Sequence, residues 1–470
     1  MQLLRLPYII LLEGETGCGI RKLLPLYRRN FIAYALTDTW WCPPHRWSFI
    51  EGGPGAGDFC RPEWHSWSGA LTIRPVMGVQ MIRVVASPAE PPEKGNSALG
   101  SMPHVLLVVD QLPKALGGGE RIALKLAALL PSYGYRAFIL TFFAHPESGA
   151  VKTPPCPIYL LPLRRTYDLA AVRGAFELRQ FLKDQRIQIV HTFFESSDLW
   201  AGFVTKTMSR AKLVWARRDM GILRTRKHEI AYRLMAGLPD AVFAVSEQVR
   251  RHAIEVDRID PRRVWTIYNG LNIEDWNRAP RPTKAPGEFL VATVGNIRRV
   301  KGHDVLIRAA ASVVRQFPKV SFCIAGDVLE PAYFSELQTL IQDLDLSRHV
   351  RFDGGIGNLR EYLAGADIFV LPSRSEGFSN AIVEAMAASL PVVATDVGGN
   401  AEAVKHGISG FLVAAENPGA LSAAILRLLT DSSQARAMGL AGRKIAAERF
   451  TIETMMSLIA GAYQNLLSAG

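Results

Sequence analysis

The sequence predicts an α/β protein with two doubly wound, Rossmann-like domains. Short continuous apolar runs, such as residues 104–110 and 289–294, are typical of parallel strands that are buried on both faces. These runs alternate with amphipathic stretches long enough for helices, which is the pattern of βαβ units. The chain has 470 residues, of which 49% are hydrophobic, so it can form two complete cores. We therefore assign residues 102–280 to a first domain and residues 281–450 to a second.

Apolar runs that end in polar or glycine-containing turns predict the individual strands. In the first domain the predicted strands cover residues 104–110, 136–142, 157–163, 187–191, 213–216, 241–245 and 264–268. In the second domain they cover residues 289–294, 320–325, 349–353, 367–371, 390–395 and 411–413. Helical spacing predicts the main helices at residues 121–130, 169–184, 247–254, 380–389, 418–429 and 452–467. Ser246 and Ser379 are the expected N-caps of two of these helices. Residues 275–287 contain three prolines and several charges, so we interpret them as the interdomain linker.

Residues 1–101 have a different composition and are predicted to form a poorly structured N-terminal extension. They contain five of the nine tryptophans and three of the five cysteines, and residues 87–100 are rich in Pro, Gly and Ser like a linker. Residues 14–21 only faintly resemble a phosphate loop, because the Gly-Lys-Ser/Thr ending is missing. A second hypothesis is a mis-assigned start, with Met81 or Met102 as the true initiator.

The charge and cysteine content limit the partners and the compartment. The formal net charge of +11 and a pI of about 9.5 favour anionic partners, which are nucleic acid, phosphorylated substrates or an anionic membrane surface. No run of eighteen apolar residues is present, so we expect no membrane-spanning helix. The five cysteines show no paired metal-binding spacing, for which a reducing cytoplasm is the simplest interpretation.

The stretch 373–387 carries the most specific chemical information. It lies between two predicted strands and contains a turn with Glu376 and a helix with Glu384. In open α/β sheets the carboxyl ends of the strands bind ligands, and the free N–H groups of a helix start favour an anion such as a diphosphate. The two carboxylates suit hydroxyl groups on either side of a diphosphate, as in a sugar nucleotide. The alternative is two solvated glutamates beside a helix.

The same stretch resembles the signature of a known family. Glu376-x7-Glu384 is followed by Pro-Val-Val-Ala-Thr at residues 391–395 and Gly-Gly-Asn-Ala-Glu at residues 398–402. This string is similar to that of retaining family-4 glycosyltransferases with the GT-B fold, and the resemblance runs from about residue 104 to the C-terminus. It implies two domains that face a cleft, with the nucleobase near residues 352–356. It also implies that the C-terminal helix, within residues 451–470, packs back on the first domain.

The resemblance also implies roles for individual residues of the donor site. Glu376 would contact the donor sugar and Glu384 would hold the ribose. The residues between them that are assigned to donor binding are Gly377, Phe378, Ser379 and Asn380.

The turn after the first strand of the second domain combines a glycine with several cations, an arrangement suited to a diphosphate. The resemblance implies that Gly295 lines the donor site and that Lys301 neutralises the leaving nucleoside diphosphate. For Lys301 the alternative is a surface lysine at a helix start. The family commonly has an arginine directly after the glycine, where this chain has Asn296. Arg298 or Arg299 could replace it, and Arg298 is slightly favoured.

The first strand of the first domain leads into a glycine turn that ends in Gly118, Gly119 and Glu120. This turn lacks the Gly-x-Gly-x-x-Gly fingerprint of dinucleotide-binding proteins. The resemblance implies that it borders the donor phosphates and the acceptor, whereas a simple tight turn is the alternative. Family members often carry His-x-His after a later strand. Here His191 matches the first histidine and Phe193 replaces the second, so His191 either lines the cleft or only ends a strand.

A basic stretch lies between residues 206 and 233, where there are nine Lys or Arg residues and two acidic residues. A solvated basic face explains it, and so does attraction to the phosphates of a lipid-linked acceptor or to anionic lipid. The second explanation predicts that neutralising Arg224, Arg226 and Lys227 weakens binding to lipid vesicles. Arg218, in the same stretch, is assigned to the acceptor side of the cleft.

Together these features predict a hexosyltransferase that moves a sugar from a nucleoside diphosphate to a glycan or polyprenyl-linked acceptor. We expect retention of anomeric configuration and a role in polysaccharide or cell-envelope synthesis, exopolysaccharide included. Alternatives on the same fold are a non-catalytic sugar-nucleotide-binding protein, a nucleotide-sugar hydrolase and a sugar-phosphate synthase. A dinucleotide oxidoreductase would share the doubly wound sheet but needs the missing fingerprint.

No Asp-x-Asp motif follows a predicted strand, so we expect neither a catalytic metal nor a cofactor. The nucleoside diphosphate sugar is a substrate. No nucleic-acid recognition module is visible, so we expect no nucleic-acid partner. The expected location is the cytoplasm, with peripheral contact at the inner face of the membrane left open.

Overall fold

The computed structural model describes residues 82–88, 102–114, 116–221, 224–277, 285 and 287–469. The predictions made for residues 1–81, including the start-site hypothesis at Met81, lie outside the described residues. Among the described residues, no helix is both long enough and apolar enough to cross a membrane.

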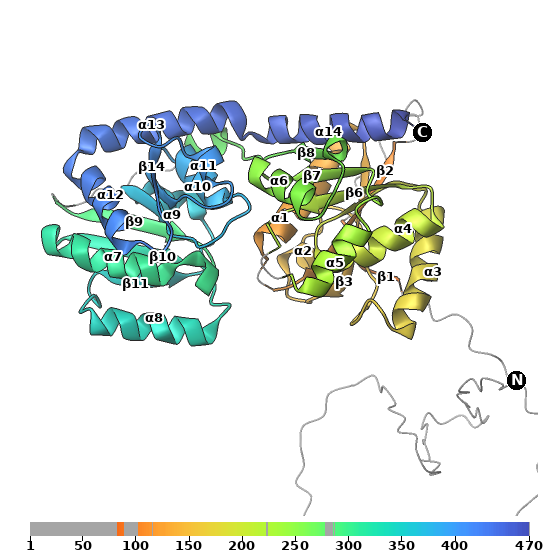
Figure 1. Cartoon of the computed structure of the whole chain (residues 1–470), viewed down its shortest axis with the longest axis horizontal. Coiled ribbons are helices and arrows are strands. Elements are labelled where there is room, and N and C mark those ends of the chain that lie inside the picture. The colour runs from red at the N-terminus through yellow and green to blue at the C-terminus, as the bar shows by residue number, and fades with distance from the viewer. Residues whose placement is uncertain are drawn as a thin grey trace, which may run out of the picture. The chain divides into compact units, whose positions relative to one another are not determined.

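The first domain is built on a parallel sheet with one antiparallel edge strand (Figure 1). Its strand order is β1-β4-β3-β2-β5-β6-β7-β8. The strands are β1 Arg83–Ala86, β2 His104–Leu112, β3 Arg136–Ala144, β4 Ile158–Leu160, β5 Ile187–Thr192, β6 Lys212–Arg217, β7 Ala241–Ala244 and β8 Val264–Thr266. The helices are α1 Gly118–Leu129, α2 Gly149–Lys152, α3 Leu169–Asp184, α4 Gly202–Met208, α5 Arg226–Leu234 and α6 Glu247–Glu255.

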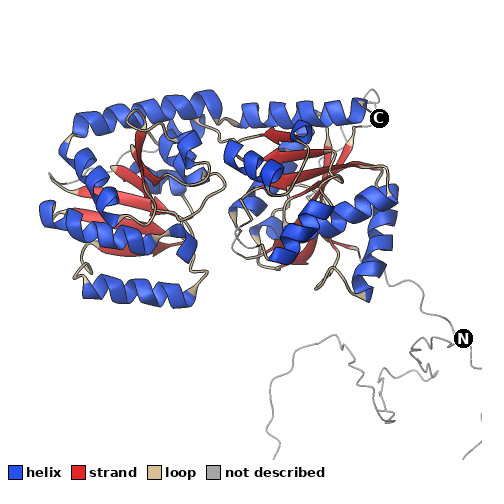
Figure 2. Ribbon diagram, in the orientation of Figure 1, coloured by secondary structure: helices blue, strands red, loops and turns tan. Residues whose placement is uncertain are grey.

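The second domain contains an entirely parallel six-stranded sheet in the order β11-β10-β9-β12-β13-β14. Its strands are β9 Phe289–Val294, β10 Val320–Ala325, β11 Val350–Gly354, β12 Ile368–Leu371, β13 Val392–Thr395 and β14 Gly410–Val413. The helices that follow are α7 His303–Gln316, α8 Pro331–Asp343, α9 Leu359–Ala364, α10 Asn380–Ala387, α11 Asn400–Ala403, α12 Pro418–Thr430, α13 Ser432–Arg449 and α14 Ile452–Ser468. Helices cover both faces of each sheet (Figure 2). The predicted pair of doubly wound domains is therefore confirmed.

Strand β2 shows why its sequence is continuously apolar. Leu106 and Val108 pack in one hydrophobic cluster with residues of α3 and α4. Val105, Leu107 and Val109 point to the opposite face and pack with residues of α1 and α14. Because side chains alternate between the two faces of a strand, burial on both faces requires apolar residues throughout.

Strand β1 corrects one prediction. Residues 83–86 lie within the segment that we expected to be unstructured, yet they pair antiparallel with β4. This strand is short and lies at the edge of the sheet, where half of its side chains remain solvent-exposed, so its apolar signal is weak.

Each sheet has a switch point, where the strand order reverses. In the first sheet, β2 lies between β3 and β5, and in the second sheet β9 lies between β10 and β12. Loops that leave two such neighbouring strands diverge to opposite faces and leave a crevice at the carboxyl ends. The loops after β2 and β5, and those after β9 and β12, therefore border the two crevices.

Helix α14 belongs to the core of the first domain, although it follows the second domain in sequence. Tyr463 is fully buried there, and the Tyr135 hydroxyl donates to the carbonyl oxygen of Ala460 at 3.1 Å. The segment by which the chain leaves the first domain lies next to the segment by which it returns. The Leu271 N–H donates to the Phe450 carbonyl at 2.9 Å, and the Ile452 N–H donates to the Leu271 carbonyl at 3.2 Å.

Candidate active site

A short polar contact at the switch point of the second sheet joins a lysine to a glutamate. Lys301 follows β9, Glu376 follows β12, and Lys301 Nζ lies 2.6 Å from Glu376 Oε1. The Ser373 hydroxyl donates to the same carboxylate oxygen at 2.7 Å. The side chain of Glu376 is largely buried, whereas that of Lys301 is partly accessible. A cation and a carboxylate are thus held together where an open sheet binds its ligand.

Arg374 connects the loop after β12 to the segment after β9. No role was predicted for this residue from the sequence. Its N–H donates to the Val300 carbonyl at 2.8 Å, and its guanidinium binds both carboxylate oxygens of Asp304 at 2.8 Å. Burial would raise the pKa of Asp304, but hydrogen bonds from Arg374 and Tyr333 lower it to about 2. A bidentate pair of this kind fixes the position of the loop that carries Glu376.

Two glycines allow the loops to approach this closely. Gly302 has φ of +67°, and a Cβ there would lie 2.1 Å from the Pro372 carbonyl oxygen. Gly398 has φ of +53°, and a Cβ there would lie 1.6 Å from the Glu376 carbonyl oxygen. Both positions exclude a side chain, because the conformation is left-handed and the space is occupied by backbone.

Glu384 lies on α10 and faces the first domain. It is half-buried, and burial raises its pKa, while the positive charges of Arg121 and Lys125 on α1 oppose this rise. Helix α10 begins at Asn380, as the sequence predicts for a helix that follows Ser379. The Ser379 side chain makes no capping hydrogen bond, so it does not occupy the N–H groups of the first turn. This helix start can therefore accept an anion.

The first domain closes over this site through a short polar chain. Arg218 Nη2 donates to Asn269 Oδ1 at 2.8 Å, and Asn269 Nδ2 donates to Asn380 Oδ1 at 2.5 Å. At Gly377 a Cβ would lie 2.0 Å from the Arg218 carbonyl oxygen, so glycine is needed for this approach. Phe378 is buried and packs against Tyr268 of the first domain. Arg218 thus lies beside the predicted donor residues.

The two arginines that are candidates for binding the diphosphate are each paired with a glutamate, one just before the start of helix α8 and one within it. Arg298 Nε lies 3.3 Å from Glu330 Oε1, and Arg299 Nη2 lies 2.6 Å from Glu336 Oε2. Among the described residues, no contact joins either guanidinium to Lys301. Gly295 lies next to Lys301, since a Cβ there would be 3.5 Å from the Lys301 Cδ atom.

The glycine turn of the first domain reaches the same region. Helix α1 begins at Gly118, where a Cβ would lie 4.0 Å from Asn380 Nδ2. At Gly119 a Cβ would lie 2.7 Å from the ring of Phe194, so this glycine permits close packing. Burial raises the pKa of Glu120, although the backbone N–H groups of Glu120 and Gly117 donate to its carboxylate.

His191 does not lie on the surface of the cleft. It is only 2% exposed, its Nδ1 lies 2.7 Å from the Tyr463 hydroxyl, and its ring packs against Phe193 and Phe243. Burial, and then the charge of Arg218, lower the pKa of His191 to about 3. The alternative of a strand-end histidine in the core therefore fits this geometry, and the prediction of a cleft-lining residue does not.

Part of the predicted basic face is buried. Arg217 lies between Asp198, at 3.0 Å, and Asp257, at 2.9 Å, and Arg224 Nη1 binds the same Asp257 at 3.0 Å. Arg217 and Arg224 also stack over the ring of Tyr232. The prediction that Arg224 contacts lipid is therefore wrong, because its side chain is only 5% exposed and binds Asp257 inside the domain. Arg226 and Lys227 on α5 are exposed.

Among the described residues, no group of three or more His, Cys, Asp or Glu side chains has the arrangement to hold a metal ion. The groups at this site that can act on a ligand include the lysine, the two glutamates and the helix start. This set can neutralise a diphosphate and accept hydrogen bonds from sugar hydroxyls.

Two family models match adjacent parts of the chain. Residues 116–275 match the model described as Glycosyltransferase Family 4, and residues 275–445 match the model described as Glycosyl transferases group 1. The two matches meet at the end of the first domain and together span both sheets apart from β1 and β2.

Parts of the chain are similar in sequence to named glycosyltransferases, and the fold is similar to that of solved structures. A lipopolysaccharide core biosynthesis mannosyltransferase, LpcC of Rhizobium leguminosarum bv. viciae, is 32% identical over 187 residues, covering 39% of this chain and 53% of LpcC. A D-inositol 3-phosphate glycosyltransferase of Thermobispora bispora is 29% identical over 322 residues, covering 63% of this chain and 74% of that enzyme. The chain thus spans about half the length of the first of these relatives. The structure of HepE from Anabaena in complex with UDP is similar in fold, with a TM-score of 0.66 and 23% identity, covering 77% of this chain and 100% of HepE.

Proposed function

Because the chain belongs to the family-4 glycosyltransferases with the GT-B fold, we propose that it transfers a sugar from a nucleoside diphosphate donor to a hydroxyl group of an acceptor. The observation that carries the proposal is the Lys301–Glu376 pair at the switch point of the second sheet. Its position at the carboxyl ends of the strands is the one that binds nucleotides in open α/β sheets.

The chemical problem in this reaction is the charge that develops on the leaving diphosphate when its bond to the anomeric carbon breaks. Lys301 supplies a positive charge, and the uncapped start of α10 supplies N–H donors and the positive end of its dipole. Groups that are already oriented toward this charge stabilise the transition state without reorganisation. Either Arg298 or Arg299 contributes only after leaving its partner, which is Glu330 or Glu336.

The two glutamates have separate tasks in this proposal. A diphosphate that binds Lys301 releases Glu376 to accept hydrogen bonds from donor-sugar hydroxyls. Glu384 binds the ribose, and its partly buried site favours hydrogen bonding to hydroxyl groups over contact with water. Gly377 and Asn380 lie between them, where the first domain closes the site and excludes water.

We propose retention of anomeric configuration, with the acceptor proton passing to a phosphate oxygen of the donor. The support is the family resemblance and the pairing of Glu376 with Lys301, which leaves Glu376 as a partner of the donor and not as a separate base. No resident metal or cofactor is required, because Lys301 and the helix start supply the positive charge.

For the acceptor we propose a glycan or a polyprenyl-linked glycan of the cell envelope. One relative is named for lipopolysaccharide core synthesis, and the proposed setting is the cytoplasmic face of the membrane. The HepE structures contain UDP and UDP-glucose, so uridine diphosphate sugars are the first donors to test.

Thermal unfolding of the full chain with a ligand panel tests the donor proposal. The panel holds uridine, guanosine and adenosine diphosphate sugars together with nicotinamide dinucleotides. A ligand at a hundredfold excess over its dissociation constant stabilises the folded state by about 2.7 kcal/mol. We expect stabilisation by one class of diphosphate sugar, and loss of that shift in Glu384→Ala.

The matched control is Glu448→Ala, which removes an exposed glutamate on α13 and should leave the shift unchanged. Stabilisation by a dinucleotide alone would overturn the proposal. Release of free sugar at the same rate with and without acceptors would identify a hydrolase instead.

A further inference from the structure

Helix α3 exposes an apolar stripe to solvent. Leu169, Val172 and Phe176 are 88%, 58% and 58% exposed, and their spacing places them on one face of the helix. Tyr167, just before the helix, is 81% exposed. The opposite face of α3 is already used, because Leu178 and Phe181 pack in the core. The stripe is therefore not a core face that has been left open, but a second apolar face directed outward.

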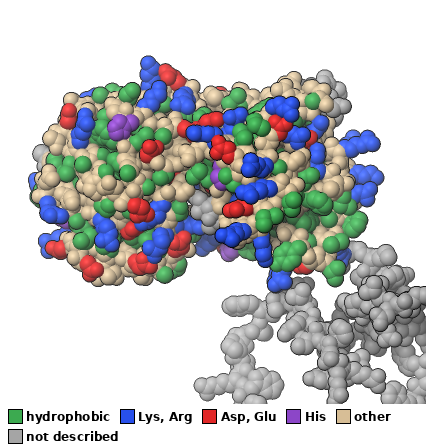
Figure 3. All heavy atoms as spheres, in the orientation of Figure 1, with side chains coloured by type: hydrophobic (Ala, Val, Ile, Leu, Met, Phe, Trp, Pro, Cys, Tyr) green, Lys and Arg blue, Asp and Glu red, His purple; other side chains and the backbone are tan. Residues whose placement is uncertain are grey.

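The neighbouring helices extend this apolar surface. Phe203 of α4 is 51% exposed, and Ile230 and Leu234 of α5 are 57% and 82% exposed. Figure 3 shows hydrophobic side chains gathered over this part of the first domain, with lysine and arginine side chains along its border. Contiguous exposed apolar surface with a polar rim usually marks an interaction site.

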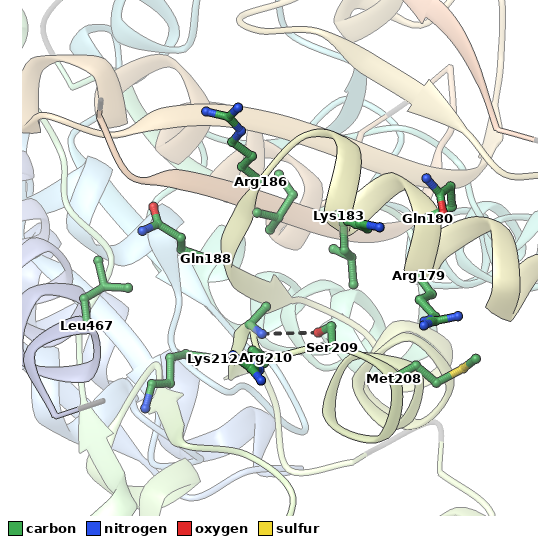
Figure 4. A pocket seen from close by; sticks show the side chains of 13 residues that line it. Arg179, Gln180, Lys183, Arg186, Gln188, Met208, Ser209, Arg210, Lys212 and Leu467 are labelled. Atoms are coloured by element: carbon green, nitrogen blue, oxygen red, sulfur yellow. Dashed lines mark hydrogen bonds between the residues drawn. The ribbon is translucent and has the colours of Figure 1, made fainter. Parts of the chain in front are cut away.

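The C-terminal half of α3 is cationic and borders a cavity of about 640 Å³ (Figure 4). This cavity lies at the amino ends of β5 and β6, so it is separate from the Lys301–Glu376 site. Five cations from α3 and from the segments beside it line the cavity: Arg179, Lys183, Arg186, Arg210 and Lys212. Among the residues that line it, all of them in the described part of the chain, there is no aspartate or glutamate.

These five cations also have no side-chain ion pair or hydrogen bond with any other described residue. In contrast, Lys206 on the adjacent α4 is neutralised by Asp240 at 3.0 Å. Positive charges that are close together and unpaired repel one another, so an anion that enters the cavity is bound favourably. The apolar stripe and the cationic cavity lie on consecutive turns of the same exposed helix face.

We propose that this surface, defined as the apolar stripe of α3 together with the cationic cavity, docks the protein on a bilayer that contains anionic lipids. Apolar side chains enter the boundary between headgroups and acyl chains, and the cations bind lipid phosphates. The inference builds on the proposed function, since an enzyme that acts on a polyprenyl-linked acceptor meets it at a bilayer. It also moves the centre of the membrane contact from Arg224, which is buried, to α3.

Charge complementarity favours a bilayer over two other occupants. A second copy of the chain would bring two cationic cavities together, which is unfavourable. The segment of residues 1–81 carries eight Lys or Arg residues against six Asp or Glu residues, so it is also positive overall. An anionic lipid surface supplies both the negative charge and the apolar phase that this face requires.

Co-sedimentation of the full chain with vesicles, in the absence of any nucleotide sugar, tests the proposal. One vesicle contains equal parts of phosphatidylglycerol and phosphatidylcholine, and the other contains phosphatidylcholine alone. We expect binding to the anionic vesicle to be stronger by about tenfold or more at low salt, and to weaken as salt is added.

Two double variants separate the contributions. Leu169→Ser with Phe176→Ser removes the stripe, and Arg179→Gln with Lys183→Gln reduces the cationic charge. Each should weaken binding to the anionic vesicle by about tenfold. The matched controls are Leu440→Ser and Lys444→Gln, which change exposed residues of α13 and should leave binding unchanged. All four variants should keep the thermal unfolding temperature of the wild type.

The proposal is overturned if the wild type binds neither vesicle, or if both double variants bind as tightly as the controls. It is also overturned if size-exclusion chromatography shows that the stripe variant converts a dimer to a monomer, because a second copy would then cover the face. A failure of the donor proposal is distinguishable, since it would remove the ligand-induced thermal shifts and leave vesicle binding intact.

Discussion

The two domains place their charged side chains in opposite ways. In the second domain, Lys301 and Glu376 lie at the edge of the sheet, where a ligand can separate them. In the first domain, Arg217 and Asp257 lie in the interior, where only other protein groups can reach them. Two sheets of the same kind therefore use charge differently: the second holds an accessible ion pair at its edge, and the first uses buried charge to hold its helices.

The largest effect should come from breaking the buried network of the first domain. Arg217→Met leaves Asp198 and Asp257 without their shared cation in a place that water cannot reach. We expect a loss of about 3–5 kcal/mol in the free energy of unfolding, measured by urea denaturation. Asp260→Asn, which breaks an exposed ion pair with Arg262, is the control and should leave the midpoint unchanged. Equal losses in the two variants would show that the contrast between buried and exposed charge is wrong.

The next effect belongs to the second domain and should appear in activity but not in stability. Lys301→Met keeps most of the side-chain volume and removes the charge that we propose faces the diphosphate. We expect turnover at saturating donor to fall by about a hundredfold to a thousandfold. Lys444→Met is the control, since it removes an exposed lysine on α13. Turnover within about threefold of the wild type would exclude Lys301 from the role proposed here.

A third and smaller effect should be shared by the domains, because each buries one histidine. Burial, and then the charge of Arg218, lower the pKa of His191 to about 3, while burial and then the charge of Lys301 lower that of His303 to about 4. The unfolded chain binds a proton at each histidine below about pH 6.5, whereas the folded protein does not. Stability should therefore fall as the pH decreases from 6.5 toward 4.

At pH 5 each histidine should account for about 2 kcal/mol of this loss. Urea denaturation at pH 7 and pH 5 checks the effect, and His191→Gln and His303→Gln should each reduce the acid loss by that amount. An acid loss as large in both variants as in the wild type would show that other groups cause it.

In each domain the elements with the clearest periodicity were predictable from sequence. Helix α3 in the first domain and strand β9 in the second have the predicted bounds, because amphipathic spacing and apolar runs encode burial directly. Lys301 follows β9 and Glu376 follows β12, and these two strands are neighbours at the switch point. The sequence places each residue shortly after its strand, and the pairing of the strands then brings the two side chains together. The separate tasks of Glu376 and Glu384 rest on the family resemblance and stay predictions.

What the sequence did not predict depends on partners that are remote along the chain. Arg374 acts through Asp304, 70 residues away, and His191 is buried by Tyr463, 272 residues away. Nothing in the local pattern indicates either contact. The basic stretch of the first domain was misinterpreted in part for the same reason, because a count of cations does not tell whether Arg224 points outward or meets Asp257 inside. Likewise, the outward apolar face of α3 was not foreseen, since its spacing alone suits a core face.

The chain leaves the first domain at Leu271 and returns to it at Ile452, and these two residues lie next to each other. The second domain can therefore be exchanged as one unit. Everything between these residues leaves and returns at a single place, where the two segments are joined by backbone hydrogen bonds at 2.9 and 3.2 Å. A chimera made by cutting at residues 271 and 451 would receive the second domain of a relative as one segment. Helix α14 and the core that it completes would stay with the first domain. If the second domain selects the donor and the first selects the acceptor, recombination at this one junction exchanges the sugar that is transferred and leaves the choice of acceptor unchanged.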